Sequence, residues 1–316
     1  MANVFKKILV TGGAGYIGSH LVPLLLDHNY SVRVFDNLLF NQKIPHHLIN
    51  NPNYEFLKAD IRDETSFNQA LKDVDLIIHL AALVGEPACR KYRDVCYETN
   101  RDAVKIINKL RDDRPLIIAS STSVYGETGG GLCSEETMPT PTLDYSISKY
   151  EAENIVRARN NFIILRPATA FGYSYRPRLD LLINEFVFKA IKEKKLEIYN
   201  PNLMRTFVHV KDLARVFLMM AENFYLFKNQ IFNVGSENLN LTKAEIGQAI
   251  KEHVDYDLKM VQVVDDPDQR NFVVNYDKIK NAGFVMNTSL YLGIKEMVDK
   301  FKNLENDPSF YNINFV

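Results

Sequence analysis

The first half of the chain alternates short apolar runs with segments of helical character. Six runs rich in Val, Ile and Leu are predicted strands, and they cover residues 6–12, 31–36, 54–60, 76–82, 115–121 and 162–168. Runs that are apolar at nearly every position indicate strands buried on both faces, as in parallel sheets. Since helical segments join them into βαβ units, the pattern predicts an α/β fold with a Rossmann-type, doubly wound parallel sheet.

The pattern changes from about residue 171. Helical segments now alternate with short strands, the helices at 181–194, 212–223 and 242–253 and the strands at 196–199 and 230–234. We expect residues 171–316 to form mainly a smaller mixed α/β lobe that binds substrate, beside the carboxyl edge of the sheet. Residues 1–170 are predicted to form the doubly wound, nucleotide-binding domain. The boundary should be interleaved, because no flexible linker separates the two parts.

Composition narrows the class of protein. The 316 residues carry a net charge of −1, so no overall field favours nucleic acid or an anionic membrane. No apolar run approaches the ~20 residues of a membrane helix, and the first residues do not resemble a signal peptide. The three cysteines, Cys89, Cys96 and Cys133, match no zinc pattern and argue against a disulfide framework. We therefore expect a cytoplasmic protein without a bound metal.

A glycine-rich turn, TGGAGYIG at residues 11–18, follows the first predicted strand. Gly12 allows a tight turn, Gly15 allows close approach to a pyrophosphate, and Gly18 allows the next helix to pack against the sheet. The start of that helix offers N–H groups and a positive dipole end to phosphate. A tight turn without a ligand is the alternative, but the strand before and the helix after favour a nucleotide cradle.

Two acidic residues end the following strands. Asp36 comes 18 residues after Gly18, close to the ~20 expected for an acid that binds the adenosine ribose. A carboxylate there repels a 2′-phosphate, which favours NAD over NADP. The alternative for Asp36 is a cap on the following loop. Asp60 ends the third strand. It would lie beside the edge of the adenine or would simply cap the end of the strand.

Tyr145 and Lys149 form a YxxxK pattern, which in a helix places both side chains on one face. A nearby ammonium stabilises a phenolate and lowers the tyrosine pKa. The phenolate can then accept a proton from a sugar hydroxyl while hydride leaves the carbon for NAD. A hydroxyl from residues 120–123, at the end of the fifth strand, can hold the substrate oxygen. The pattern also occurs on solvated helices, but its position downstream of the glycine turn favours chemistry.

Together these motifs resemble an extended short-chain dehydrogenase/reductase of the nucleotide-sugar epimerase/dehydratase family. The resemblance covers nearly the whole chain. It rests on TGGAGYIG, FDNL (35–38), HLAA (79–82), SSTSVYG (120–126), YSISK (145–149), RTFVHVKDLA (205–214), FNVGS (232–236) and DPDQR (266–270).

The resemblance implies roles for individual residues. Tyr145 would be the base, Lys149 its electrostatic partner and nicotinamide-ribose ligand, and Ser121 the catalytic hydroxyl. NAD would be bound by Gly12, Gly15, Tyr16, Ile17, Gly18, Asp36, Asn37, Asp60, Ile61, Leu80, Ala81, Ala82, Tyr145 and Lys149. Candidate ligands of a nucleotide sugar are Glu86, Thr122, Ser123, Thr169, Arg176, Arg178, Asn184, Arg205 and Arg270.

Some of these substrate candidates have simpler alternatives. Arg205 and Arg270 would hold the diphosphate, because guanidinium forks suit phosphate oxygens, and surface ion pairs are the alternative. Arg176 and Arg178 would meet phosphates or form a basic rim. Glu86 would face the sugar or the solvent.

The chain also departs from family patterns. Dehydratases of the family carry an Asp-Glu pair where this chain has Thr122 and Ser123, so we expect no 4,6-dehydratase. Thr169 replaces an asparagine that is frequent in epimerases. The loops at residues 83–92 and 172–186 look closest to the branch with GDP-heptose 4-dehydrogenases and UDP-glucose 4-epimerase-like enzymes.

The sequence therefore predicts an NAD-dependent enzyme that oxidises a nucleotide-sugar hydroxyl, by preference at C4. Net epimerisation and net dehydrogenation both remain open. A 4-keto-sugar reductase and a non-catalytic dinucleotide-binding regulator are the alternatives. Helices around residues 100–111 and 145–159 resemble those that pair in family dimers, so we expect a homodimer that binds neither nucleic acid nor membrane.

Overall fold

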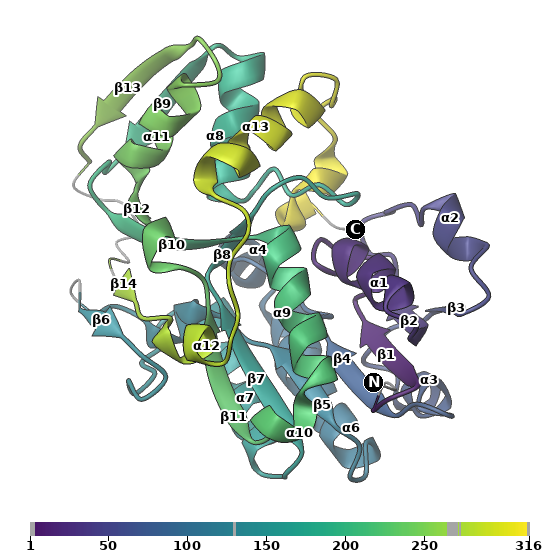
Figure 1. The fold of residues 1–316 in the computed structure, drawn as a ribbon. Helices are drawn as coiled ribbons and strands as arrows, with labels where there is room; N and C mark the ends of the chain where they lie inside the picture. Colours follow the sequence, from purple (N-terminus) through teal and green to yellow (C-terminus); the bar gives the residue numbers. More distant parts are fainter. Residues whose placement is uncertain (1–3, 129–130, 264–270, 272, 315–316) are drawn as a thin grey trace.

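A computed structural model describes residues 4–128, 131–263, 271 and 273–314 (Figure 1). Its centre is a seven-stranded sheet in the order β11-β7-β5-β4-β1-β2-β3, with every neighbouring pair parallel. The strands are β1 (Lys7–Thr11), β2 (Ser31–Asp36), β3 (Tyr54–Lys58), β4 (Leu76–His79), β5 (Leu116–Ala119), β7 (Phe162–Pro167) and β11 (Gln230–Val234). The predicted Rossmann-type fold is confirmed, and the strand order reverses between β1 and β4.

Helices cover both faces of this sheet. The side chains of β1 show why: Ile8 and Val10 belong to the core on one face, and Leu9 belongs to the core on the other. Helices α1 (Gly18–Asp27) and α9 (Val210–Glu222) cover the first face. The second face is covered by α3 (Glu64–Ala70), α6 (Ala103–Leu110) and α7 (Asp144–Arg157). The inner strands β1, β4, β5 and β7 are therefore buried on both sides, as the pattern predicted. The same expectation is wrong for β3, whose residues are half-buried or exposed because it is an edge strand of the sheet.

A smaller lobe with its own apolar core lies beyond the carboxyl ends of the strands (Figure 1). Its helices are α8 (Leu182–Lys192), α11 (Lys243–Lys251) and α13 (Leu290–Phe301), and its strands β9 (Lys195–Tyr199) and β13 (Asp257–Val261) are paired in parallel. A three-stranded sheet of β8 (Thr169–Phe171), β10 (Met204–His209) and β12 (Asn240–Thr242) lies between the lobe and the main sheet.

Short elements complete the described chain. They are α2 (His46–Ile49), α4 (Glu86–Lys91), α5 (Arg93–Tyr97), η1 (Glu98–Asp102), η2 (Thr122–Tyr125), β6 (Leu132–Cys133), α10 (Phe224–Phe227), η3 (Glu237–Leu239), β14 (Val273–Val274), α12 (Asp277–Asn281), η4 (Pro308–Phe310) and η5 (Asn312–Asn314). Among the described residues, no helix has the length and apolarity needed to span a membrane.

Strand β11 corrects one expectation. Residues 230–234 are a strand, as predicted, but their expected place in the smaller lobe is wrong, because β11 pairs with β7 at the edge of the main sheet. Helix α9, which precedes it, packs beside α1 on the same sheet. The partner of a short strand depends on tertiary contacts, which its position in the sequence does not reveal.

The glycine turn after β1 provides a test of this packing. Gly12 has a φ of +69°, and an added Cβ would lie 2.6 Å from the backbone nitrogen of Ala81. Gly283 also has a positive φ, +91°, but a Cβ there would meet nothing within 4 Å. We expect Gly12→Ala to lower the free energy of unfolding by about 2 kcal/mol or more, through strain plus a steric clash.

Gly283→Ala is the matched control and should cost only about 1 kcal/mol, because it adds backbone strain alone. Urea denaturation of both variants measures the difference. Equal losses would show that the approach of Ala81 does not constrain residue 12.

Candidate functional site

A cleft of about 1830 Å³ opens at the carboxyl ends of the central strands, between the main sheet and the smaller lobe. The volume exceeds the 300–1,000 Å³ typical of a small-molecule site, so the cleft has room for a cofactor and a substrate together. Its position at the reversal of strand order is where doubly wound folds bind their ligands. Ser121, Tyr145, Lys149 and every residue predicted to bind the cofactor line this one cleft.

The glycine turn forms one wall of the cleft. The amide of Gly12 donates to the carbonyl of Phe35 (2.9 Å), and the amide of Gly15 donates to the carbonyl of Gly12 (3.0 Å). Helix α1 begins without a side-chain cap and without an acidic residue in its first turn. Its positive end therefore faces the cleft uncompensated, which fits the pyrophosphate of a dinucleotide.

Asp36 and Asp60 lie farther along the same wall. The Asp36 carboxylate accepts hydrogen bonds from the amides of Ala14 (3.1 Å) and Leu38 (2.8 Å). Asp60 pairs with Arg62 (2.9 Å). Both acids therefore cap their own loops, the alternative role considered for each. Both also line the cleft, and their contacts with the adenosine remain predictions.

The three candidate catalytic side chains come from two elements. Ser121 follows β5, and its hydroxyl oxygen accepts from the amide (3.1 Å) and hydroxyl (2.9 Å) of Ser123. Tyr145 and Lys149 lie one turn apart in α7. Burial lowers the pKa of Lys149 to about 8, and the charge of Glu153 opposes that shift. A lysine with a pKa this close to neutral pH is typical of functional sites.

A buried ion pair lies behind this group. Arg166 of β7 donates to both carboxylate oxygens of Glu153, at 2.9 and 2.7 Å, and the two side chains are 1% and 0% exposed. The hydroxyl of Ser120 also donates to Glu153 (2.5 Å). Arg166 further donates to the Tyr125 hydroxyl (3.1 Å), which donates to Asn233 of β11 (2.7 Å). The network thus joins α7, the ends of β5 and β7, and β11.

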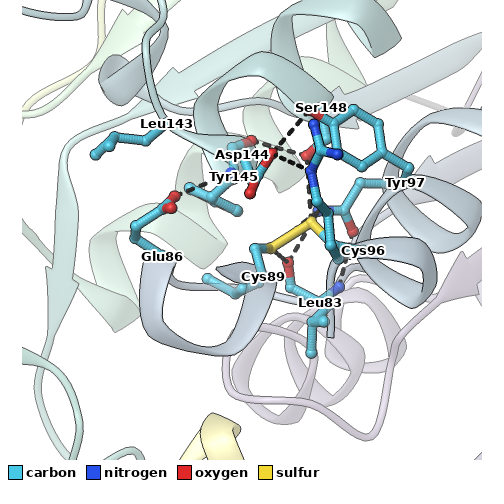
Figure 2. Close-up of a disulfide and its surroundings, with 12 residues drawn as sticks. Leu83, Glu86, Cys89, Cys96, Tyr97, Leu143, Asp144, Tyr145 and Ser148 are labelled. Carbon is cyan, nitrogen blue, oxygen red and sulfur yellow. Dashed lines mark hydrogen bonds and ion pairs between the residues drawn. A yellow bond between two sulfur atoms is a disulfide. The ribbon is translucent and has the colours of Figure 1, made fainter. Parts of the chain in front are cut away.

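Glu86 takes a position that the sequence did not predict. Its carboxylate accepts from the backbone amide of Tyr145 (3.0 Å), at the start of α7 (Figure 2). A carboxylate at a helix N-terminus is favourable, so Glu86 helps to fix the helix that carries Tyr145 and Lys149. Glu86 also lines the cleft, and its contact with a sugar remains a prediction.

The cysteines correct another expectation. Although their number argued against a disulfide framework, the structure joins Cys89 and Cys96 beside the start of α7 (Figure 2). The consecutive helices α4 and α5 meet at Tyr92, and the turn there brings the two cysteines together, which spacing alone does not show. The side-chain nitrogen of Asn100, Nδ2, lies 3.4 Å from Cys96 Sγ and donates to the hydroxyl of Ser148 (3.1 Å). The disulfide therefore lies beside α7, the helix that carries Tyr145 and Lys149.

The predicted substrate residues are distributed unevenly. Those that line the cleft are Glu86, Thr122, Ser123, Thr169, Arg176, Arg178 and Arg205. Asn184 is fully buried behind the wall, where it accepts from the amide of Gly172 (2.9 Å) and donates to the carbonyl of Arg178 (2.9 Å). Its direct contact with a sugar remains a prediction. Arg270 lies outside the described residues.

Sequence reasoning missed the C-terminal segment. Tyr311, Asn312 and Ile313 line the cleft, and the segment lies between the lobes (Figure 1). Asn312 is the centre of its contacts: its side chain donates to the carbonyl of Val84 (2.8 Å) and accepts from Arg176 (2.7 Å). No motif marks these residues, so only the fold reveals them. Among the described residues, no group of three or more His, Cys, Asp or Glu is placed to hold a metal.

The lowered pKa of Lys149 predicts a stability effect. The unfolded chain keeps the lysine proton up to pH 10.5, whereas the folded protein without cofactor loses it near pH 8. The free energy of unfolding of the wild type should therefore rise between pH 8 and 10.5, because the unfolded state binds more protons there. Lys149→Met should remove this slope and stabilise the protein at pH 7 by about 1–3 kcal/mol.

Urea denaturation at pH 7, 8.5 and 10 tests both statements. Lys105→Met, at an exposed position paired with Asp102, is the control and should keep the wild-type slope. A slope retained in Lys149→Met would show that another group titrates.

Comparisons with known proteins identify the family. Residues 8–235 match the model of the NAD dependent epimerase/dehydratase family. A putative UDP-glucose 4-epimerase of Methanocaldococcus jannaschii is 31% identical, over 94% of this chain and 98% of that protein.

Two solved structures share the fold. A dTDP-glucose 4,6-dehydratase of Bacillus anthracis in complex with NAD has 26% identity and a TM-score of 0.80, over 93% of this chain and 96% of the other. A UDP-glucose 4-epimerase of Thermotoga maritima with UDP-glucose has 26% identity and a TM-score of 0.80, over 93% and 98%. The predicted family and cofactor are thus confirmed. The chain belongs to the NAD dependent epimerase/dehydratase family and is an NAD-dependent enzyme of the nucleotide-sugar epimerase/dehydratase type.

Proposed function

We propose that the protein oxidises a hydroxyl of a nucleotide sugar, at C4 of a nucleoside-diphosphate hexose or heptose. The observation that carries the proposal is that Ser121, Tyr145 and Lys149 line the same cleft as the glycine turn. The cleft is large enough for NAD and a second nucleotide. The relatives named for UDP-glucose 4-epimerase support the class of substrate.

The side chains would divide the chemistry between them. NAD, when bound, supplies the acceptor for the hydride that leaves the sugar carbon. The Tyr145 phenolate accepts the proton of the sugar hydroxyl, and the Lys149 ammonium stabilises the phenolate before the transfer. The Ser121 hydroxyl donates a hydrogen bond to the same sugar oxygen. The C–H and O–H bonds of the alcohol are broken, and a keto sugar is formed.

The fate of that keto sugar sets the net reaction. If the keto sugar rotates in the cleft and regains the hydride on its other face, the product is the 4-epimer. If it leaves, the enzyme is a 4-dehydrogenase, with GDP-heptose as a candidate substrate, in glycan precursor synthesis. A 4-keto-sugar reductase is the alternative, and Asp36 argues against it by disfavouring NADPH. A complete set of Ser121, Tyr145 and Lys149 argues against a non-catalytic regulator.

We propose further that the enzyme is not a 4,6-dehydratase, although one of the similar structures is. That reaction needs an acid and a base beside the catalytic hydroxyl. Here the hydroxyl of Thr122 donates to the carbonyl of Pro167 (3.3 Å), and the hydroxyl of Ser123 donates to Ser121 (2.9 Å). Hydroxyls of ordinary pKa do not supply the required proton transfers.

A panel of GDP-, UDP-, dTDP- and CDP-sugars tests the proposal. We expect the NAD-loaded protein to convert at least one of these nucleotide sugars. The products are identified by mass spectrometry and NMR. An isomer of unchanged mass identifies an epimerase, and a keto product two mass units lighter identifies a dehydrogenase. A dehydrated product would contradict the exclusion of dehydratase chemistry.

Tyr145→Phe is the control for the panel. It keeps the ring but removes the proton acceptor, so turnover should fall by about 100-fold or more while NAD remains bound. Full activity of this variant would remove Tyr145 from the mechanism. No turnover of any nucleotide sugar by the wild type would count against the proposed function.

A homodimer is also part of the proposal. Helices α6 and α7 lie side by side on one face of the sheet, as a pair that could meet its copy in a four-helix interface. Light scattering should give the mass of two chains. A mass of one chain at micromolar concentration would overturn this arrangement. The cytoplasmic location remains a prediction.

A further inference from the structure

Arg176 reaches from the loop between β8 and α8 to the cofactor wall of the cleft. Its guanidinium carbon lies 3.9 Å from the ring centroid of Phe40. Phe40 belongs to the loop that follows β2 and Asp36. Arg176 therefore connects the substrate side of the cleft to the loop that follows the predicted ribose ligand. Its position in the sequence predicts a substrate ligand instead.

The charge of Arg176 has no carboxylate partner among the described residues. Its Nη2 donates to the side-chain oxygen of Asn312 (2.7 Å) and to the carbonyl of Ser309 (3.2 Å), both neutral acceptors. Neighbouring Arg178, in contrast, forms an ion pair with Asp180 (2.6 Å). Arg176 is only 4% exposed. The charges of Asp180 and Asp36 act on Arg176 only from a distance, without an ion pair. A buried cation without a direct anionic partner is costly, so this one is suited to a ligand that brings negative charge.

One donor of Arg176 is ready for such a ligand. Its Nε is buried and has no hydrogen-bond partner in the described part of the chain. Buried donors are almost always paired, so an unpaired one in the lining of a cleft points to a ligand atom. Burial also lowers the pKa of Arg176 to about 9, an effect that a bound anion would reverse.

Local contacts fasten the backbone of this loop near the start of helix α1. The hydroxyl of Ser174, two residues earlier, donates to the backbone carbonyl of Tyr16 (3.0 Å) and accepts from the amide of Arg176 (3.3 Å). Tyr16 belongs to the glycine turn, whose helix end receives the pyrophosphate of a dinucleotide. The loop of Arg176 is thus fastened to the segment where the cofactor phosphates lie.

We propose that Arg176 binds the diphosphate of NAD from the side opposite the start of α1. The Phe40 ring supports the guanidinium plane, and Asn312 of the C-terminal segment fixes its orientation. Negative charge on the diphosphate then compensates the buried cation. NAD is held between the glycine turn and a side chain from the other side of the cleft, which favours slow release. A substrate diphosphate offers the same chemistry, and the contact with Phe40 is what favours NAD.

Arg176→Gln tests the proposal through binding rather than turnover. The variant removes the positive charge and the planar set of N–H donors of the guanidinium, while keeping a polar side chain. Calorimetry on protein freed of nucleotide should show about 10- to 100-fold weaker binding of NAD and of ADP-ribose, the usual range for a lost charged hydrogen bond. Adenosine lacks the diphosphate, so its affinity should be unchanged. Arg176→Lys keeps the charge without the fork and should show a smaller loss.

A second set of measurements separates the two diphosphates. UDP and GDP are titrated into NAD-loaded wild type and Arg176→Gln, and we expect affinities within threefold of each other. Weaker binding of UDP or GDP with unchanged NAD affinity would assign Arg176 to the substrate and overturn the proposal. Unchanged affinity for every ligand would also overturn it. These readouts do not depend on which sugar the enzyme converts.

Arg111→Gln is the control for the loss of a buried arginine. Arg111 is fully buried far from the cleft lining and donates to the carbonyls of Arg114, Asn160 and Asn161. This variant should lower the melting temperature and leave NAD affinity unchanged. If Arg176→Gln weakens adenosine as much as NAD and melts like Arg111→Gln, its role is structural and the proposal fails. Should Arg176→Gln not fold, Arg176→Lys carries the same comparisons.

Discussion

Glu153 and Arg166 form an ion pair inside the protein, and this pair links α7, β7 and the end of β5 beside the candidate site. Glu153 lies one turn beyond Lys149 in α7, and it also accepts from Ser120, the neighbour of Ser121. Removing one member of a buried ion pair leaves an uncompensated charge and costs about 3–5 kcal/mol. The pair therefore couples the stability of the sheet to the relative placement of Ser121 and Lys149, the neighbours of its contacts. It also supplies the negative charge that keeps the pKa of Lys149 from falling further.

The walls of the cleft are held by a second set of contacts that come from distant parts of the sequence. Glu86 fixes the start of α7, and Asn100 joins the disulfide region to Ser148 of the same helix. On the opposite side, Asn312 ties the C-terminal segment to Val84 and Arg176. A cleft built this way needs distant parts of the chain, because its lining includes residues from the glycine turn, α7 and the C-terminal segment.

The sequence carried enough information for six strands of the main sheet and for the candidate pair Tyr145 and Lys149. Apolar runs revealed the inner strands because burial on both faces leaves a continuous signal, and Tyr145 and Lys149 stood out because helical spacing places them on one face. Three features were hidden. The partner of β11 and the position of Asn312 depend on contacts between segments that are far apart in the sequence. The pairing of Cys89 with Cys96 depends on a turn whose geometry cannot be predicted from the amino-acid sequence. The charge of Arg176 suggested a phosphate contact or a basic rim, and its contact with Phe40 could not be predicted from the sequence.

The pairing of β11 with β7 has a consequence for how the protein is made. A ribosome that has reached residue 170 has produced the first six strands of the sheet, but β7 still has an open edge of apolar residues. Unpaired edges of this kind associate with other chains. The edge is closed only when residues 230–234 emerge, after the helices and strands that precede them. The nascent chain therefore passes through an aggregation-prone interval during translation, and fragments that end near residue 170 should be poor candidates for an independent cofactor domain.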